Sequence, residues 1–456
     1  MNLRKNKITV AVSRPSLYFP KVVFRFFASV VQTGLLFIFG LVTGCSSEDE
    51  MSPVRPPSGD FVEGRTVLVY MCAQNSLGAD LRHRSDSAEL AEGRKFLADE
   101  DRLLVFLDDG GKPRIYLFTR DEKHPRVVRR WTEDICSTKP ETFAEVLNWT
   151  RENYPSREYG LVMWSHADGW LPATDRNYVR PYSFGIDTGS SSMRGDKGPQ
   201  MDVRDMARAI VAGGMHFRYI FFDACLMQNI ETCYALRGVT DYVIASPMSI
   251  PAAGAFYTHQ MQNGLFAADP TEIVGTYWQD VTDEVLWNDY DDYGIVISAV
   301  RTRRLEELAA LMAEVLPRSE AARELWPDVS GVQYYQAYTS SYFYRPHNYD
   351  MRDAMRRLLS AGDYARMDRL LDEIIVRKEA TDCFWIGPGY WTYGTVDKEH
   401  YCGLSMFVPQ EVYGGNSRFT PLGDLNEAFR HTEWYEAAGW KHTRWGRNTE
   451  SAKDML

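Results

Sequence analysis

The chain has 456 residues, of which 45% are hydrophobic and 13% are aromatic. That length suits one large domain with additions or two to three average domains, and the composition supplies a sizeable core. The net charge of -11 argues against a nucleic-acid-binding surface, because such surfaces need basic patches.

The first 44 residues predict a targeting segment rather than a part of the fold. A basic stretch, from Arg4 to Arg25, precedes the apolar run "FFASVVQTGLLFIFGLVTGC". The run ends in "LVTGC", which resembles a bacterial lipobox. The resemblance implies lipidation of Cys45 and removal of a lipoprotein signal peptide, residues 1–44. An ordinary uncleaved membrane anchor is the alternative.

Residues 45–60 are predicted to tether the lipid to a globular domain. The segment "MSPVRPPSGD" (51–60) is polar and rich in proline, which is typical of a tether. We therefore expect a protein that is held by its lipid in the bacterial cell envelope, at the outer membrane. The acidic run "SSEDE" follows Cys45, but it does not decide between the periplasm and the cell surface.

From residue 61 to residue 255, apolar runs of strand length alternate with segments of helical period. The predicted strands are 66–73, 102–109, 114–119, 159–165, 219–224 and 241–247. The predicted helices are 81–100, 142–154, 203–214 and 226–238. Continuous apolar strands separated by helices predict an α/β fold with a mainly parallel sheet that is covered on both faces.

Residues 256–456 continue this pattern less regularly and are expected to complete the sheet and its flanking helices. The predicted elements are a strand at 293–300, a helix at 304–316, a helical pair within 353–380 and a strand at 403–409. Two long loops, 171–200 and 383–396, stand out because loops of that length in compact domains are often functional.

Reactive side chains follow two of the predicted strands. "VMWSHADGW" leads out of one strand to His166, and "IFFDAC" leads out of another to Cys225. Functional groups gather beyond the carboxyl ends of parallel strands, and a helix N-terminus with a nearby imidazole favours a thiolate. The sequence thus suggests a Cys-His pair, with the backbone N–H groups of Ala167 and Cys225 binding an oxyanion. A buried structural cysteine and a core or surface histidine are the alternatives.

Several motifs, in order, resemble one family. "YGLVMWSHADGW" and "YIFFDACLMQNIE" resemble the His and Cys segments of the clostripain family of cysteine peptidases, and "VLVYMCAQNSL" resembles its first strand and loop. The resemblance spans residues 65 to 440. It implies a caspase-like α/β/α sandwich, His166 as general base, Cys225 as nucleophile and peptide or protein substrates. The chemistry needs no cofactor.

The chain departs from the family pattern at two places. Ala167 stands where the family normally has glycine, and the segment 247–257 has no carboxylate where the family has an acidic stretch. Asp223 does match the acidic residue that the family places two positions before the nucleophile, which implies cleavage after Arg or Lys. A helix N-cap is the alternative role for Asp223.

Two other classes of protein fit these departures. One is a surface protein that keeps the fold but only binds peptides or glycans. The other is a working peptidase that prefers a neutral or small side chain before the cleaved bond.

The family includes members that mature by cutting a loop after the His strand. In the 171–200 loop, Arg194 and Lys197 are the favoured positions, because Pro181 makes the bond after Arg180 a poor substrate. An uncut surface loop is the alternative.

Weaker signals concern metals and aromatic residues. The turn 108–111, with Asp108 and Asp109 before two glycines, could bind the calcium on which some family members depend, but a solvated turn explains it better. No metal-ligand spacing is present. The aromatic-rich 382–394 could shape a substrate subsite or pack on the core.

Overall fold

The computed structural model describes most of the chain after residue 61. The described residues are 62–171, 183–189, 191–282, 294–340, 343–386, 393–413 and 425–447. The predicted signal peptide (1–44), Cys45, the tether (45–60) and Arg180 lie outside them. In the described residues, no helix is long and apolar enough to cross a membrane.

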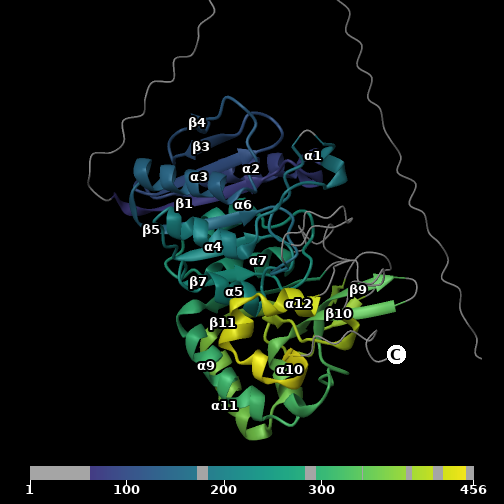
Figure 1. Cartoon of the computed structure of the whole chain (residues 1–456). Helices are drawn as coiled ribbons and strands as arrows, with labels where there is room; N and C mark the ends of the chain where they lie inside the picture. Colours follow the sequence, from purple (N-terminus) through teal and green to yellow (C-terminus); the bar gives the residue numbers. More distant parts are fainter. Residues whose placement is uncertain are drawn as a thin grey trace, which may run out of the picture. The chain divides into compact units, whose positions relative to one another are not determined.

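In the described part of the chain, nine strands form one sheet. They are β1 (Val62–Cys72), β2 (Arg102–Asp108), β3 (Arg114–Phe118), β4 (Arg126–Arg130), β5 (Ser156–Trp164), β6 (Tyr219–Asp223), β7 (Tyr242–Ala245), β8 (Val296–Arg301) and β11 (Ile375–Ala380). Their order is β11-β8-β7-β6-β5-β1-β2-β3-β4 (Figure 1). Strands from both sides of residue 255 therefore share this sheet, and the domain boundary at that residue stays a prediction.

The centre of the sheet is parallel and its two margins are antiparallel. β2, β1, β5, β6 and β7 pair in parallel. β3 and β4 continue one margin with antiparallel pairs, and β8 and β11 continue the other. The mainly parallel α/β sheet that the sequence predicted is confirmed.

Helices cover both faces of the sheet. One face carries α3 (Pro140–Asn153), α4 (Val203–Ala212), α5 (Ile230–Leu236) and α9 (Leu305–Val315), and the other carries α2 (Arg82–Gly93), α6 (Tyr257–His259) and α7 (Glu272–Thr282). β1 shows why both faces must be covered. Leu68 and Tyr70 are buried on the first face, whereas Val67, Val69 and Met71 are buried on the second.

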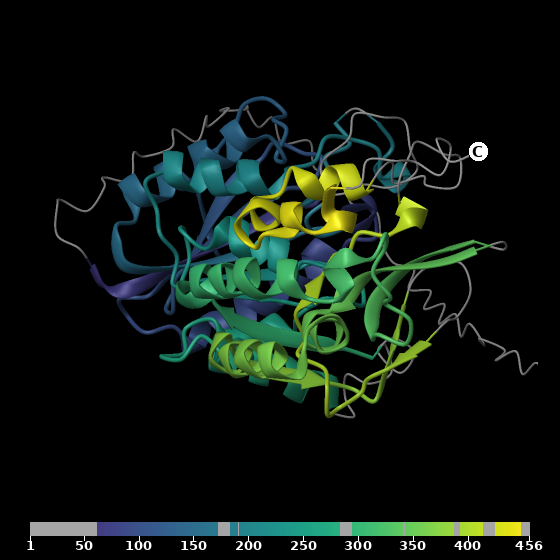
Figure 2. The same ribbon diagram turned by 60° about the horizontal axis from the view of Figure 1, so that its bottom comes forward.

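The C-terminal part extends the first helical layer. It contains α10 (Met351–Leu358), α11 (Ala361–Ile374), α12 (Leu425–Arg430), α13 (Glu433–Ala437) and α14 (Arg444–Arg447). α13 packs against both α5 and α9, and in Figure 2 the yellow C-terminal helices lie beside the green ones. The expected three-layer sandwich is therefore present, with the last residues of the described chain packed on its core.

Two smaller strand groups complete the described fold. β9 (Tyr334–Ser340), β10 (Phe343–Asp350) and β14 (Ser405–Met406) form an antiparallel sheet, and β12 (Cys383–Trp385) pairs with β13 (Tyr393–Thr395). The remaining short helices are α1 (Ser76–Ala79), a π-helical turn η3 (Gln260–Gly264) and a set of 3-10 turns: η1 (Arg94–Phe96), η2 (Met193–Gly195), η4 (Thr302–Arg304), η5 (Leu316–Arg318), η6 (Ala321–Arg323), η7 (Glu411–Tyr413) and η8 (Trp440–His442).

Three predicted elements differ from the structure. The helical pair expected to run to residue 380 ends at Ile374, because the β-branched run that follows pairs with β8 as β11. The late strand predicted at 403–409 is only Ser405–Met406 and pairs with β10. The helix expected from residue 226 begins at Ile230, after a turn.

A buried carboxyl ends β2. Asp108 is fully buried, and neither of its side-chain oxygens has a hydrogen-bond partner among the described residues. Nearby Asp187 accepts hydrogen bonds from the backbone N–H (2.6 Å) and hydroxyl (3.1 Å) of Ser137. Burial, followed by the charge of Asp187, raises the pKa of Asp108 to about 8. Asp108 therefore holds a proton to higher pH than an exposed aspartate does.

Asp108→Asn should flatten the pH dependence of stability. Because the folded pKa lies above the unfolded one, the stabilising contribution of Asp108 is present at low pH and is lost as pH rises from about 4 to about 8. We expect the Tm of the wild type to fall over that range by at least about 2 °C more than that of D108N.

The control is Asp109→Asn, because Asp109 pairs with Arg114 at 2.8 Å and is not buried against Asp187. Calorimetry of the three proteins across this range of pH is the measurement. Parallel Tm curves for D108N and the wild type would contradict the assignment.

Candidate active site

The two predicted reactive residues lie beyond the carboxyl ends of neighbouring strands. β5 and β6 pair in parallel up to Trp164 and Asp223, which face each other in the register. His166 and Cys225 each follow two residues later, and both line one pocket of about 440 Å³. Ala167 and Asp223 line the same pocket. The sheet therefore brings together the four residues that sequence analysis placed in the site.

Cys225 stands in a tight turn rather than at a helix N-terminus. The next residue, Leu226, has a left-handed backbone (φ 62°), and its N–H donates to Met248 O at 3.0 Å. α5 starts only at Ile230, where the side chain of Asn229 caps it by accepting from Thr232 N at 2.8 Å. The expected support of the thiolate by a helix N-terminus is therefore wrong. The strained turn holds Cys225 instead.

Cys225 is half-buried, and its thiol packs against the segment after β7. The backbone N–H of Ile250 donates to Cys225 Sγ at 3.4 Å. Burial raises the pKa of the thiol to about 12, against the effect of the Ile250 N–H, and Asp168 and Asp223 act in the same direction as burial. In this conformation Cys225 is protonated at neutral pH, so a base has to remove its proton before it can act as a nucleophile.

His166 is held through one ring nitrogen. Nε2 lies 2.8 Å from Ser76 Oγ and 3.8 Å from Asp196 Oδ2. Burial lowers the pKa of the imidazole, and the charge of Asp196 opposes this effect. In the described residues His166 and Cys225 form no direct hydrogen bond. A neutral imidazole can accept a proton, which is the state that a general base requires.

Two segments position the backbone around His166. Gly185 N donates to His166 O at 2.8 Å, and Gly185 has φ 77°, with only 2.7 Å between the position of an added Cβ and Thr138 Cγ2. On the other side, Asn75 Nδ2 donates to Ser165 Oγ at 3.1 Å and to Cys72 O at 2.7 Å. Gly185, where no side chain fits, and the hydrogen bonds of Asn75 together fix the end of β5 that carries His166.

The two candidate oxyanion donors are uncommitted. Ala167 bridges Phe184, and the bonds of that bridge involve the neighbours His166 and Asp168. In the described part of the chain, neither Ala167 N–H nor Cys225 N–H donates to another residue. Ala167 is not among the residues with a positive φ, so alanine stands here without the backbone strain that replacing a family glycine could cause.

Asp223 anchors the wall of the pocket. Its carboxylate accepts from Ala255 N at 3.1 Å and from Tyr257 OH at 2.8 Å, and the cap of α5 is Asn229, so Asp223 is not an N-cap. Burial raises its pKa to about 6, against the effect of these two donors. Asp223 is therefore mostly charged at neutral pH. Gly254 approaches it so closely that an added Cβ would lie 2.7 Å from Oδ2.

Two further carboxyls behind Asp223 were missed from the sequence. Asp86 Oδ2 accepts from Trp164 Nε1 at 2.7 Å, and Glu89 Oε2 accepts from Tyr257 N at 2.8 Å. Burial, followed by the charge of Asp223, raises the pKa of Asp86 to about 9, and burial raises that of Glu89 to about 7. Their spacing on α2 only indicates that they share a helix face, and nothing in that pattern pointed to β6.

The segment with the two candidate processing positions lies over the site. Arg194, in η2, pairs with Asp80 at 2.8 Å, and its side chain is 68% exposed. Lys197 is exposed. Asp196, between them, lines the pocket. Sequence reasoning named Arg194 and Lys197 but missed Asp196 and its partner Ser76, because no motif marks either.

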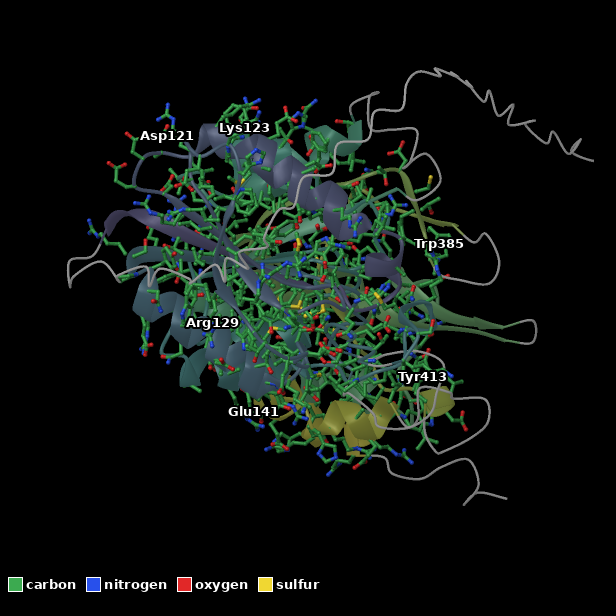
Figure 3. The ribbon with its side chains drawn as sticks, turned by 90° about the horizontal axis from the view of Figure 1, so that it is seen from above. Asp121, Lys123, Arg129, Glu141, Trp385 and Tyr413 are labelled. Atoms are coloured by element: carbon green, nitrogen blue, oxygen red, sulfur yellow. The ribbon has the colours of Figure 1, made fainter. Side chains whose placement is uncertain are left out.

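The weaker candidates are also placed. Asp109 pairs with Arg114, and no group of three or more His, Cys, Asp or Glu side chains in the described ranges could hold a metal ion. Phe384 is buried against Tyr335, whereas Trp385 lines the pocket with Gln336, beside the β9–β10 hairpin (Figure 3). The aromatic segment thus packs on the core and also reaches the pocket.

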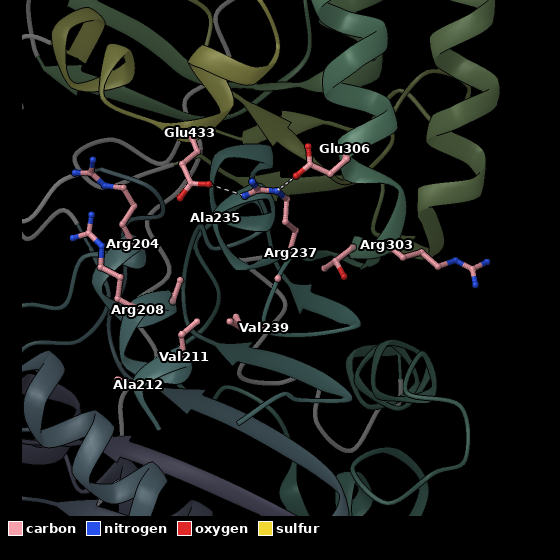
Figure 4. Close-up of a pocket in the computed structure, with 13 residues that line it drawn as sticks. Arg204, Arg208, Val211, Ala212, Ala235, Arg237, Val239, Arg303, Glu306 and Glu433 are labelled. Carbon is pink, nitrogen blue, oxygen red and sulfur yellow. Dashed lines mark hydrogen bonds and ion pairs between the residues drawn. The ribbon is translucent and has the colours of Figure 1, made fainter. Parts of the chain in front are cut away.

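Another pocket, of about 660 Å³, lies near the residues that precede β7, away from the carboxyl ends of the strands. It is lined by the ends of α4 and α5, and Arg237 there pairs with Glu306 at 2.5 Å and Glu433 at 2.7 Å (Figure 4). Its described lining residues include no cysteine and no histidine. The candidate cysteine and histidine therefore both lie in the pocket of about 440 Å³.

Comparison with known proteins identifies the family. The model of the clostripain family of C11 peptidases matches residues 69–383. The chain belongs to the clostripain family. It is a cysteine endopeptidase.

Solved structures agree with this assignment. A secreted C11 cysteine protease from Bacteroides thetaiotaomicron, bound to an irreversible peptide inhibitor, has a TM-score of 0.67 and 26% identity. An inactive zymogen C11 protease from Parabacteroides distasonis has a TM-score of 0.67 and 28% identity. Each match covers 83% of this chain and 99% of the other. No curated protein sequence matches significantly. The caspase-like fold expected for the clostripain family is confirmed.

Tyr257→Phe should destabilise this clostripain-family chain in a pH-dependent way. The variant removes the hydroxyl that donates to Asp223. We expect the free energy of unfolding to fall by about 1–3 kcal/mol above pH 6, where the carboxylate is charged, and by less at lower pH. Urea unfolding at several pH values measures this.

Tyr219→Phe is the matched control, because Tyr219 OH is also buried but donates to a carbonyl, Leu265 O, at 2.8 Å. Its cost should not depend on pH over the same range. Equal pH dependence for the two variants would contradict the assigned role of Tyr257.

Proposed function

We propose that this cysteine endopeptidase is lipid-anchored in the bacterial cell envelope and cleaves peptide bonds after Arg or Lys with a Cys225–His166 dyad. The observation that carries the proposal is the pocket at the ends of β5 and β6, where thiol, imidazole, two free N–H groups and a carboxylate meet. This set contains a nucleophile, a base, oxyanion donors and a counter-charge for a basic side chain.

The proposed reaction uses these groups in turn. His166 takes the proton from Cys225, and the thiolate attacks the scissile carbonyl. The N–H groups of Ala167 and Cys225 bind the oxygen that becomes negative. His166 then gives its proton to the leaving amine, and a water deprotonated by His166 hydrolyses the acyl-enzyme. No cofactor takes part in these steps.

Substrate choice is assigned to Asp223. Its carboxylate lines the pocket beside Cys225 and, with a pKa of about 6, carries charge at neutral pH. A buried carboxylate favours a cationic side chain, because a neutral one leaves the charge unpaired. Trp385 and Gln336 line the same pocket and give it a partly apolar wall.

Maturation by a cut after Arg194 or Lys197 is part of the proposal. Asp196, next to Lys197, already lies in the pocket, so the candidate bonds are close to the dyad. Arg194 stands in a 3-10 turn, which must unwind before its bond could enter a cleft as extended chain. Lys197 is therefore the better position. One similar structure is described as an inactive zymogen.

The lipid anchor rests on the lipobox resemblance around Cys45, outside the described residues. Acylation there would tie the enzyme to the outer membrane, facing the periplasm or the outside, where peptides and proteins are its substrates. A similar protease from Bacteroides thetaiotaomicron is described as secreted, which agrees with export of this chain.

A peptide library varied at the residue before the cleaved bond tests the proposed chemistry, with residues 46–456 as the enzyme. Cys225→Ala should abolish turnover, and His166→Ala should lower kcat by about 100-fold or more. Asp223→Asn should lower kcat/KM for Arg and Lys substrates by about 30-fold, with little change for neutral ones.

The preference for Arg and Lys should also weaken below about pH 6, as Asp223 takes up a proton. Turnover confined to neutral residues would overturn the specificity and keep the dyad. Turnover that persists in Cys225→Ala would overturn the dyad.

Cys45→Ala tests the anchor. Cells grown with an alkyne fatty acid should label the wild type and not C45A, and C45A should keep residues 1–44, because it has no thiol to acylate at residue 45. Equal labelling and equal mass of the protein in both strains would contradict lipidation. Cys383→Ala, which changes an exposed thiol, is the control.

A further inference from the structure

One ring nitrogen of His166, Nε2, is held by contacts with two other residues. We propose that Ser76 and Asp196 are positioning residues for His166: Ser76 fixes the ring through Nε2, and Asp196 supplies the negative charge beside the same nitrogen. The contacts are 2.8 Å from Ser76 Oγ and 3.8 Å from Asp196 Oδ2. The inference rests on the proposed dyad, and extends it to four residues.

Ser76 can accept from the tautomer that the reaction needs, and the carboxylate of Asp196 favours a proton on the same nitrogen. A neutral imidazole carries one proton, so a base that accepts at Nδ1 must carry that proton on Nε2. Nε2–H can donate to Ser76 Oγ, which is at hydrogen-bond distance. The other tautomer would place the proton on Nδ1 and leave no nitrogen on that side to receive the thiol proton.

Ser76 is itself held rigidly. It is the first residue of α1, and the cap of α1 is Asn75, whose side chain also binds Cys72 O, Ser165 Oγ and Ile186 O. These three acceptors come from β1, the end of β5 and the 183–189 segment. The hydroxyl that orients the imidazole is therefore fixed to the same strand ends that carry it.

Asp196 is placed by a second set of contacts. Its Oδ1 accepts from Ser76 N at 2.8 Å, so one carboxylate binds the serine backbone and approaches His166. Its backbone is left-handed (φ 45°), a conformation that costs free energy and needs outside support. The support comes from the Ser76 N–H and from Met193, whose Cε lies 2.8 Å from the position of an added Cβ on Gly78.

The charge of Asp196 acts when His166 becomes positive. Proton transfer from Cys225 creates an imidazolium, and a carboxylate 3.8 Å from Nε2 stabilises it more than the neutral ring. The other ionisable groups around the pocket are Asp168 on the His166 loop and Asp223 and Cys225 at the end of β6. Asp196 is the group among them whose contact with the imidazole is direct.

The test compares Ser76→Ala, Ser76→Thr, Asp196→Asn and the parent, all as residues 46–456. Ser76→Ala should lower kcat by about 10- to 100-fold with KM unchanged, since only the base is misplaced. Ser76→Thr keeps a hydroxyl and should recover most of the rate. Asp196→Asn should move the acidic limb of the kcat/KM profile to lower pH, by about half a unit or more, because the imidazolium loses a charge partner.

Asp80→Asn is the matched control. It removes the ion pair with Arg194 on the same segment without touching His166, so its pH profile should match that of the parent. Intact-mass measurement of every sample shows whether the 191–200 segment has been cut, which separates positioning from processing. Profiles of Ser76→Ala and Asp196→Asn that match the parent would overturn the inference. The inference would also be overturned if uncut Asp196→Asn had a higher kcat/KM than the uncut parent, because Asp196 would then hinder His166 instead of positioning it.

A failure of the proposed dyad can be told apart from a failure of the inference about Ser76 and Asp196. If the parent turns over no peptide, the proposed function fails, and the alkylation rate of Cys225 by iodoacetamide against pH then decides the inference. Ser76→Ala should shift the midpoint of that curve upward, because a misplaced base stabilises the thiolate less. An unshifted midpoint would overturn the role of Ser76.

Discussion

The pairing of β5 with β6 is the constraint on which the site depends. Neighbouring strands lie about 4.8 Å apart, and the register that sets Trp164 against Asp223 brings His166 and Cys225 out of the sheet at the same level. Both strands are buried on two faces, so a slip of one residue would bury the wrong side chains and move the thiol away from the imidazole. The core therefore fixes the position of the two reactive residues.

The turns that leave this pair of strands contain features that cost stability. Leu226 adopts a left-handed backbone, and several carboxyls are buried behind the pocket. Each of these lowers stability unless its neighbours compensate, and here they do so with hydrogen bonds. Tyr257 OH and Ala255 N donate to Asp223, and Leu226 N donates to Met248 O. The segment after β7 supplies all of these partners. It is thus a structural wall as well as the side of the substrate pocket.

The sequence predicted the parts of the site that follow from strand order. Apolar runs locate β5 and β6, and the residues that follow them must share one edge of a parallel sheet. It did not predict where α5 begins. The apolar residues from 226 onward fit a helix that starts there as well as one that starts after the Asn229 cap. β11 was also missed, since its residues extend a helical pattern without interruption and pair with a strand about 75 residues earlier in the chain.

Ser76, Asp86 and Asp196 could not be found by the same reasoning. Their roles come from contacts between elements that are far apart in sequence, such as the 90 residues between Ser76 and His166. Periodicity reports which face of an element is buried, but it does not report which two elements meet. Strand order pointed to His166 and Cys225, and the resemblance to the clostripain family added their roles and Asp223, whereas side-chain geometry was needed for the residues that support them.

A cut in the segment over the pocket would divide the chain into two polypeptides. Residues 191–200 connect β5 to β6 by way of α4, so a cut after Arg194 or Lys197 would leave His166 and Cys225 on different polypeptides. The β5–β6 ladder and the shared core would then be all that joins the two halves of the site. Unfolding of the cut protein would become a dissociation, and recovery of activity after denaturation would depend on protein concentration, as it does for a heterodimer.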